Sequence, residues 1–112
     1  MRESRASGVL YHAGFDRLDS QIRECFEGSR GPGELPLSRR RGRVYGAMVP
    51  VGKYTLSGPC VAWVYKELGE AEFARTYVIL TGSLKPGVFA SSEVWKTPFG
   101  MVRLDNELLK DL

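Results

Sequence analysis

The sequence predicts an α/β fold built on a βαβ unit with parallel strands and an added hairpin. Two apolar runs, residues 44–49 (VYGAMV) and 76–80 (TYVIL), are rich in the residue types of buried parallel strands. Between them, residues 58–68 carry a helical pattern. A crossover of this kind is right-handed and makes its two strands parallel. The chain has 112 residues, so we expect one domain spanning residues 1–112.

Two further helices are predicted from apolar spacing and capping residues. Leu18, Ile22, Cys25 and Phe26 fall on one face of a helix over Asp16–Phe26. Asp16 is its predicted N-terminal cap, and Gly28 stands just beyond its end. Near the end of the chain, Asp105 is the predicted cap of a helix over Asn106–Leu112.

Local signals also define the central helix and the hairpin. Ser57 is the predicted cap of the helix over residues 58–68. That helix is apolar almost all round, which predicts that it is largely buried. Two extended segments flank residues 97–100 (TPFG), and the Pro-Phe-Gly centre predicts a turn between them.

The positive charge of the chain is concentrated in one loop. The formal net charge is +3, and residues 29–43, a basic Gly/Pro/Arg loop, hold five arginines and one glutamate, so the remainder carries about −1. The cluster Arg39–Arg43 could bind phosphate or RNA, whereas the simpler interpretation is a mobile charged loop. Because the charge is local and forms no basic face, we do not expect nucleic acid as a partner.

Cysteine usage and hydropathy bear on the compartment. Cys25 and Cys60 alone make no disulfide framework and suit a reducing compartment. The printed sequence has no apolar run near the roughly 20 residues of a membrane span, and residues 1–8 lack the apolar core of a signal peptide. We therefore expect a cytoplasmic protein without membrane contact.

Chemistry in a parallel sheet is expected beyond the carboxyl ends of its strands, here in residues 50–57 and 81–87. These loops contain no histidine, carboxylate or cysteine, and the only histidine, His12, lies far upstream. A transition metal takes three or four nitrogen, sulfur or carboxylate ligands. We therefore predict no catalytic residue, no metal site and no cofactor, and hence no enzyme.

The same loops offer a weaker possibility, an anion site. Lys53 and Lys85 lie on the two neighbouring loops, and the free N–H groups of the central helix are expected to point the same way. Tyr54, Ser57 and Ser83 complete this candidate set. The alternative, two solvated lysines with no ligand, stays open.

Four blocks of the sequence, in order, resemble the Memo family, also described as protein B of the AmmeMemoRadiSam system. Residues 8–13 (GVLYHA) are similar to its Gly-x-Phe-Tyr-Pro-Ala-like opening. Residues 50–58 (PVGKYTLSG) resemble Pro-His-Ala-Gly-Tyr-x-Tyr-Ser-Gly, and residues 79–84 (ILTGSL) take the place of Ile-Leu-Gly-Pro-Asn-His. Residues 95–100 (WKTPFG), followed by Asp105, match Trp-x-Thr-Pro-Leu-Gly and a later aspartate.

The resemblance covers residues 8–112 and corresponds to the N-terminal half of the family. It implies part of an α/β sandwich related to the class III extradiol dioxygenases. It also implies that the family's two metal-binding histidines in this half are replaced here by Val51 and Leu84. Aliphatic side chains cannot coordinate a metal, and Lys53 beside the first position would repel one.

Three functional hypotheses follow. The first is a degenerate, non-catalytic Memo-like domain, a pseudo-enzyme that acts as a binding or assembly module. Its expected partner is a second copy in a homo-oligomer or a chain carrying a Memo-like C-terminal half. The second is one half of a split Memo-like metal-dependent oxidoreductase completed by a partner chain. The third is an anion or nucleotide binder that uses Lys53, Lys85 and a helix N-terminus.

Overall fold

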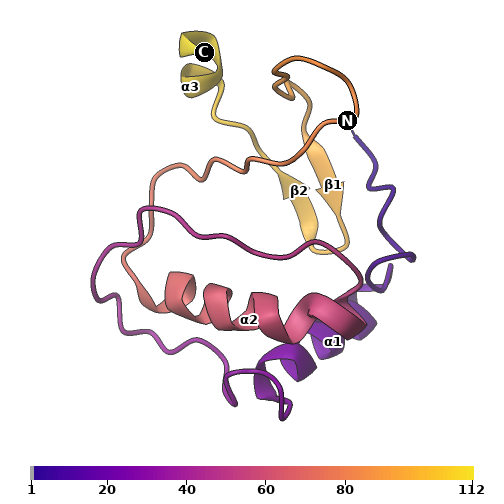
Figure 1. The fold of residues 1–112 in the computed structure, drawn as a ribbon, viewed down its shortest axis with the longest axis vertical. Helices are drawn as coiled ribbons and strands as arrows, with labels where there is room; N and C mark the ends of the chain where they lie inside the picture. The colour runs from indigo at the N-terminus through magenta and orange to yellow at the C-terminus, as the bar shows by residue number, and fades with distance from the viewer. Residues whose placement is uncertain (1) are drawn as a thin grey trace. The chain divides into compact units, whose positions relative to one another are not determined.

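The computed structural model describes residues 2–112, which form two compact units. The helical unit comprises residues 5–73, and the hairpin unit comprises residues 2–4 and 74–112. The elements follow one another as α1, α2, β1, β2 and α3 (Figure 1). The mixed α/β class predicted from the sequence is confirmed. The single domain stays a prediction.

Helix α1 spans Phe15–Glu27 and confirms the first predicted helix. Its predicted cap is wrong, because Gly14 holds the N-cap position and no side chain caps the helix. Asp16 lies instead in the first turn, where its carboxylate meets the positive end of the helix dipole. At the other end, the Gly28 N–H donates to Glu24 O at 2.8 Å, as expected for a glycine that ends a helix.

Helix α2 spans Tyr54–Glu70, so it begins earlier than predicted. Lys53 holds the N-cap position, and the Ser57 hydroxyl donates to Lys53 O at 3.1 Å from within the first turn. The backbone N–H of Tyr54 donates to Leu10 O at 2.9 Å. The capping role predicted for Ser57 is therefore wrong. Among residues 2–112, no helix combines the length and apolar composition needed to cross a membrane.

The two helices pack together around a small core. The buried residues of this core are Cys25, Phe26 and Ala62, and Ile22, Leu35 and Tyr54 pack around them half-buried. The helices can approach closely because residue 58 is glycine: a β-carbon there would lie 2.4 Å from Cys25 Sγ.

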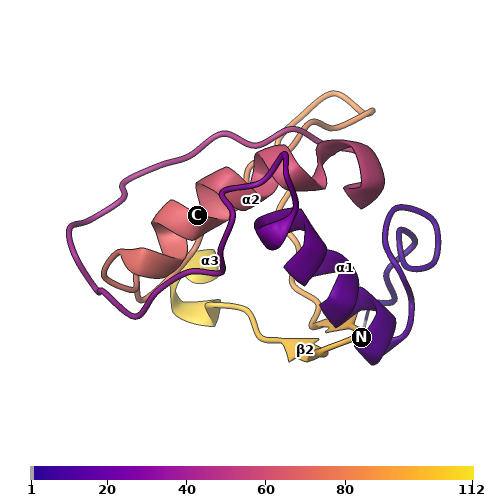
Figure 2. The same cartoon turned by 90° about the horizontal axis from the view of Figure 1, so that it is seen from below.

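Only part of α2 is buried, which corrects the prediction of a largely buried helix. Gly58 and Ala62 are its buried residues, whereas Trp63 is 54% exposed and Leu56 is 78% exposed. Residues 28–53 run out to the C-terminal end of α2 and return along the helix to its first turn (Figures 1 and 2). This single irregular segment covers less of the helix than a sheet would.

The two predicted parallel strands are absent, which corrects the βαβ core. Residues 44–49 and 76–80 form no strand, and within the described part of the chain their backbone groups have no backbone hydrogen-bond partner. Most of their apolar side chains face solvent, for example Tyr45 at 93% and Ile79 at 84% exposure. Strand propensity describes a fit to a pleated, half-buried surface, and no neighbouring strand supplies that surface here.

The predicted hairpin is confirmed in the hairpin unit. Strands β1 (Trp95–Thr97) and β2 (Gly100–Val102) pair antiparallel, with Trp95 opposite Val102 and Thr97 opposite Gly100. Gly100 has a φ of 125°, which an L side chain rarely adopts, so the turn requires a glycine at this position. The Arg2 N–H donates to Val94 O at 2.7 Å, and the Arg2 guanidinium stacks over the Trp95 ring at 4.7 Å.

Helix α3 (Asn106–Asp111) confirms the last predicted helix. The Asp105 side chain accepts a hydrogen bond from the Leu108 N–H at 2.9 Å, as predicted for its N-cap. It also accepts one from the Thr76 hydroxyl. These two donors, the Leu108 N–H first, hold the pKa of the Asp105 carboxyl below its ordinary value.

The effect of a substitution at Gly58 on stability should depend on whether residue 25 is cysteine. We expect Gly58→Ala to lower the free energy of unfolding by about 1–3 kcal/mol, because overlap with Cys25 Sγ outweighs the roughly 1 kcal/mol that alanine gains in helix propensity. In a Cys25→Ala background the overlap is removed, and the same change should then stabilise the protein. Urea unfolding of the protein with and without Gly58→Ala, in the Cys25 and the Cys25→Ala backgrounds, measures the two changes in the free energy of unfolding.

Gly46→Ala is the matched control, because a β-carbon at Gly46 meets nothing within 4 Å. It should change stability by less than about 0.5 kcal/mol. Equal effects of Gly58→Ala with and without the Cys25 thiol would show that this contact does not limit the helix packing.

Low pH should destabilise α3, because it protonates the Asp105 carboxylate at the N-cap. Because the folded-state pKa of Asp105 is depressed, its stabilisation is full above the ordinary carboxyl pKa and is lost as pH falls through the lowered value. We expect the helical Cα chemical shifts of residues 106–111 to diminish over that range. Asp105→Asn should keep the helix and remove its pH dependence, whereas Glu107→Gln should leave the pH dependence in place.

Candidate functional site

The predicted site residues fall into two groups, one in each unit. Lys53, Tyr54 and Ser57 gather at the first turn of α2, and Val51 lies just before it. Ser83, Leu84 and Lys85 belong to an irregular segment of the hairpin unit. The combined anion site stays a prediction, and each group is informative by itself.

In the helical unit, Tyr54 is part of the packing between the helices. Its ring lies 5.3 Å from the ring of Tyr11, and its carbonyl oxygen accepts a hydrogen bond from Cys25 Sγ at 3.7 Å. Burial, followed by the proximity of Tyr11, raises the pKa of the Tyr54 phenol. The Ser57 hydroxyl donates to Lys53 O. Tyr54 and Ser57 therefore serve the helix start, which leaves Lys53 as the exposed charge of this group.

In the hairpin unit, the group forms a local turn. The Lys85 N–H donates to Ser83 Oγ at 3.2 Å, and the Leu84 side chain between them is fully exposed. Val51 in the other group is 86% exposed. The two positions where the family resemblance implies metal ligands thus carry aliphatic side chains that contact little protein.

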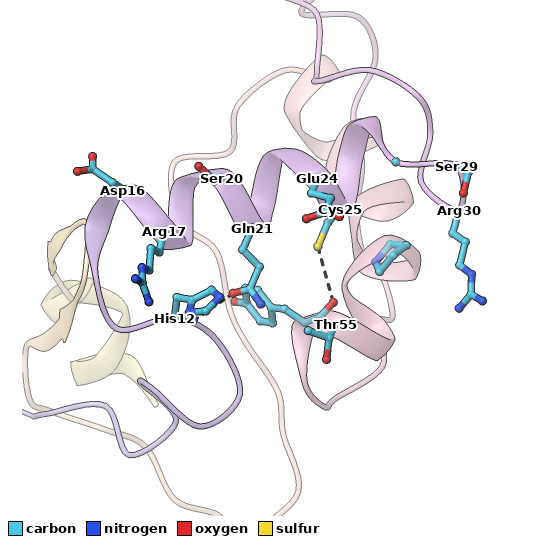
Figure 3. A pocket seen from close by; sticks show the side chains of 13 residues that line it. His12, Asp16, Arg17, Ser20, Gln21, Glu24, Cys25, Ser29, Arg30 and Thr55 are labelled. Atoms are coloured by element: carbon cyan, nitrogen blue, oxygen red, sulfur yellow. Dashed lines mark hydrogen bonds between the residues drawn. The ribbon is translucent and has the colours of Figure 1, made fainter.

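A polar cleft that the sequence did not indicate lies between α1 and the first turn of α2. Its volume is about 700 Å³. Figure 3 shows His12, Arg17 and Gln21 along one part of it and Cys25 and Thr55 along another. The cleft residues are separated in the sequence, so only the packing of the two helices reveals them. The one sequence signal was the polar face of α1.

Two of the groups that line this cleft make structural contacts. The His12 N–H is bonded to Gln21 Oε1 at 3.1 Å, which positions the backbone of residue 12. The Cys25 thiol donates to a backbone carbonyl, and burial raises its pKa, so it stays protonated and weakly nucleophilic. Carboxylates and guanidinium groups both line the walls, namely those of Asp16, Glu24, Arg17 and Arg30. The cleft therefore favours neither sign of charge.

The residues present do not fit the metal that the family resemblance implies. A metal centre needs several nitrogen, sulfur or carboxylate donors within reach of one point. Among residues 2–112, no three or more histidine, cysteine, aspartate or glutamate side chains are grouped in that way. Val51 and Leu84 offer no donor atom.

The basic loop is attached to the C-terminal end of α2. The Arg40 guanidinium donates to Gly69 O at 3.1 Å and stacks over the Phe73 ring at 3.6 Å. Arg39 Nε lies 3.9 Å from Glu70 Oε2, and Arg43 Nε lies 3.1 Å from Glu72 Oε2. The C-terminal end of a helix is the negative end of its dipole, so positively charged side chains are favoured there. These arginines thus have a structural function within the helical unit.

Comparison with known families identifies the fold family. The sequence profile of the family described as Memo-like protein matches residues 2–112. This chain belongs to the Memo-like family. The resemblance inferred from the four sequence blocks is therefore confirmed.

Relatives of known sequence agree with the Memo-like assignment. A MEMO1 family protein of Methanosarcina mazei is 38% identical over 112 residues, which cover 96% of this chain and 38% of the relative. MEMO1 family proteins of Methanosarcina barkeri and Methanococcus maripaludis are 34% and 33% identical over 116 residues. The chain spans about two fifths of the length of these relatives, namely 39% and 41% of the latter two. No solved structure matches the chain significantly.

The arginine contacts at the end of α2 predict unequal effects of neighbouring substitutions. We expect Arg40→Ala to lower the free energy of unfolding by about 0.5–1 kcal/mol, because it removes a cation–π contact and a bond to a helix-terminal carbonyl. Arg40 has a φ of 51°, and alanine keeps the β-carbon, so the backbone cost is unchanged. Urea denaturation is the measurement.

Arg41→Ala is the matched control. Within residues 2–112, Arg41 is bonded only through its backbone N–H, which donates to Glu70 O at 2.9 Å, and alanine preserves that bond. Its stability should stay within about 0.5 kcal/mol of the parent protein. A general role of positive charge would instead make the two variants equally unstable.

Proposed function

We propose that this chain is a non-catalytic Memo-like module that assembles with another polypeptide. The observation that carries the proposal is the state of residues 44–49 and 76–80. Their composition is that of buried strands, yet they form no strand, they are largely exposed, and within the described part of the chain their backbone groups lack backbone partners. Such segments pair readily with strands from another chain.

Several apolar side chains of these segments are almost fully exposed. In residues 44–49, Tyr45 and Met48 are 93% and 91% exposed. In residues 76–80, Ile79 and Leu80 are 84% and 91% exposed. Parallel strands in α/β proteins are normally buried on both faces, so apolar side chains on both sides of a segment indicate cover from both sides. Assembly would supply that cover.

The length of the relatives suggests the kind of partner. The chain matches 38–41% of the relatives' length, so about three fifths of a Memo-like protein has no counterpart in this sequence. A polypeptide with that remaining part would carry the strands that complete the sheet. A second copy of this chain is the other possible partner, in a homo-oligomer.

The absence of catalysis is proposed from the two substituted positions. Val51 and Leu84 replace the histidines that the family resemblance implies, and neither side chain can bind a metal. A split metal-dependent oxidoreductase would therefore have to take every ligand from its partner chain. This makes the split enzyme the weaker candidate.

Metal content tests the non-catalytic part of the proposal. After loading with iron, zinc or copper and dialysis, elemental mass spectrometry should find less than about a tenth of an equivalent of metal. A stoichiometric metal that survives dialysis would contradict the proposal. His12 and the two cysteines would then be the first residues to substitute.

Sedimentation velocity tests the assembly part. The protein should form a complex with itself or with the part of the Methanosarcina mazei relative that it does not cover, used as the probe. Met48→Asp combined with Ile79→Asp should weaken that complex at least about tenfold, because a buried charge without a partner is costly. Val9→Asp, at a 65% exposed valine outside the two segments, is the matched control. A protein that stays monomeric alone and with the probe would contradict assembly.

A further inference from the structure

We propose that residues 44–49 accept a β-strand from a partner polypeptide, and that this strand is apolar in its centre and acidic at its ends. The inference rests on the proposed assembly function and names one surface and one class of partner for it. Its parts are a groove beside α2, an unpaired backbone, and a particular distribution of charge.

The groove lies between residues 44–48 and the part of α2 that carries Trp63, Val64 and Glu67. Its volume is about 410 Å³, and its walls include Val44, Met48, Trp63 and Val64. Figures 1 and 2 show this stretch of chain running along the helix. The Trp63 indole N–H donates to Arg30 O at 3.0 Å, which holds the half-exposed ring in place. A fixed aromatic ring beside an exposed methionine is a suitable contact for an apolar side chain.

The backbone beside this groove can extend a sheet. Within the described part of the chain, no residue from 44 to 49 donates or accepts a backbone hydrogen bond. The segment contains no proline before Pro50, so each of its residues has both a backbone N–H donor and a carbonyl acceptor. Addition of a strand to such an edge is a recurrent mode of peptide recognition, in which main-chain bonds give affinity and pockets give specificity.

Charge distinguishes a partner strand from a second copy of this chain. Residues 44–52 carry no charged side chain, whereas Arg43 and Lys53 lie at the two ends. Arg43 remains 72% exposed although it pairs with Glu72. Antiparallel self-pairing would bring the Arg43 end of one copy near the Lys53 end of the other, and parallel self-pairing would bring like ends together. Like charges facing each other across strands are destabilising, so acidic ends fit this surface better.

One acidic side chain, Glu67, lines the groove and affects which charges the partner strand can carry. Glu67 of α2 lines the groove wall rather than either end of the segment. It disfavours acidic side chains in the centre of an incoming strand and does not affect its ends to the same degree. The expected order along the partner strand is therefore acidic, apolar, acidic.

Synthetic peptides test this inference with the full chain. One peptide has a Val-Thr-Val-Ile-Val core between glutamates, the second has lysines in place of the glutamates, and the third has prolines at alternate core positions. We expect the first peptide to slow amide hydrogen exchange of residues 44–49 about tenfold or more, the second to do so far less, and the third not at all. Proline cannot donate to the ladder, so it separates strand pairing from apolar adhesion.

Two variants give the site-specific control. Ala47→Pro should abolish the protection, whereas Ile79→Pro, in the other exposed segment, should leave it intact. Both positions are exposed and lack backbone hydrogen bonds in the described structure, so neither proline should unfold the helical core.

Four outcomes would overturn the inference. Equal protection by the glutamate and lysine peptides would refute the charge argument. Protection of residues 76–80 instead of 44–49 would place the docking surface elsewhere and leave the proposed assembly function intact. Protection of residues 44–49 that rises with protein concentration and needs no peptide would make a second copy the occupant. No protection by any peptide, together with a complex in the sedimentation experiment, would also leave assembly standing without this surface.

Discussion

The close contact between Cys25 of α1 and Gly58 of α2 is the constraint on which the helical unit depends. The two helices share one small core, and a β-carbon at residue 58 would lie only 2.4 Å from the cysteine sulfur. This approach also brings Tyr54 against Tyr11 and places the first turn of α2 beside the polar face of α1. The cleft between the helices is thus a consequence of their packing, and Cys25 has a structural role there. Burial keeps its thiol protonated, in agreement with that role.

The positive charge of the chain has a local structural explanation. Arg39, Arg40 and Arg43 of the basic loop contact a carbonyl oxygen, two carboxylates and an aromatic ring at the C-terminal end of α2. On the same helix, Lys66 bonds to Glu34 at 3.0 Å and also pairs with Glu70. The loop is therefore held along the helix at several points, and its return path positions residues 44–49 beside α2. The contacts of this cluster that the structure shows are intramolecular.

Membership of the Memo-like family and the exposure of two strand-like segments both suggest that these segments lack the neighbouring strands they would pair with. The family match extends over residues 2–112, yet this chain spans about two fifths of its relatives' length. A strand is stable only with neighbours, because its backbone groups and both of its faces must be satisfied. Residues 44–49 and 76–80 have the composition of strands without those neighbours. A partner that supplies them would convert exposed segments into a buried sheet.

The sequence by itself determined the elements that depend on local interactions. Helical periodicity located α1, the Asp105 cap located α3, and the Thr-Pro-Phe-Gly turn located the hairpin, because each signal lies within a few residues of the structure it produces. Four short blocks also identified the family and the aliphatic residues Val51 and Leu84. Only the tertiary structure decided the start of α2, the cleft around His12 and the attachment of the basic loop, since these arise from contacts between distant residues. It also decided that residues 44–49 and 76–80 pair with no strand in the described part of the chain: strand propensity is local, but the pairing that makes a sheet requires a neighbour.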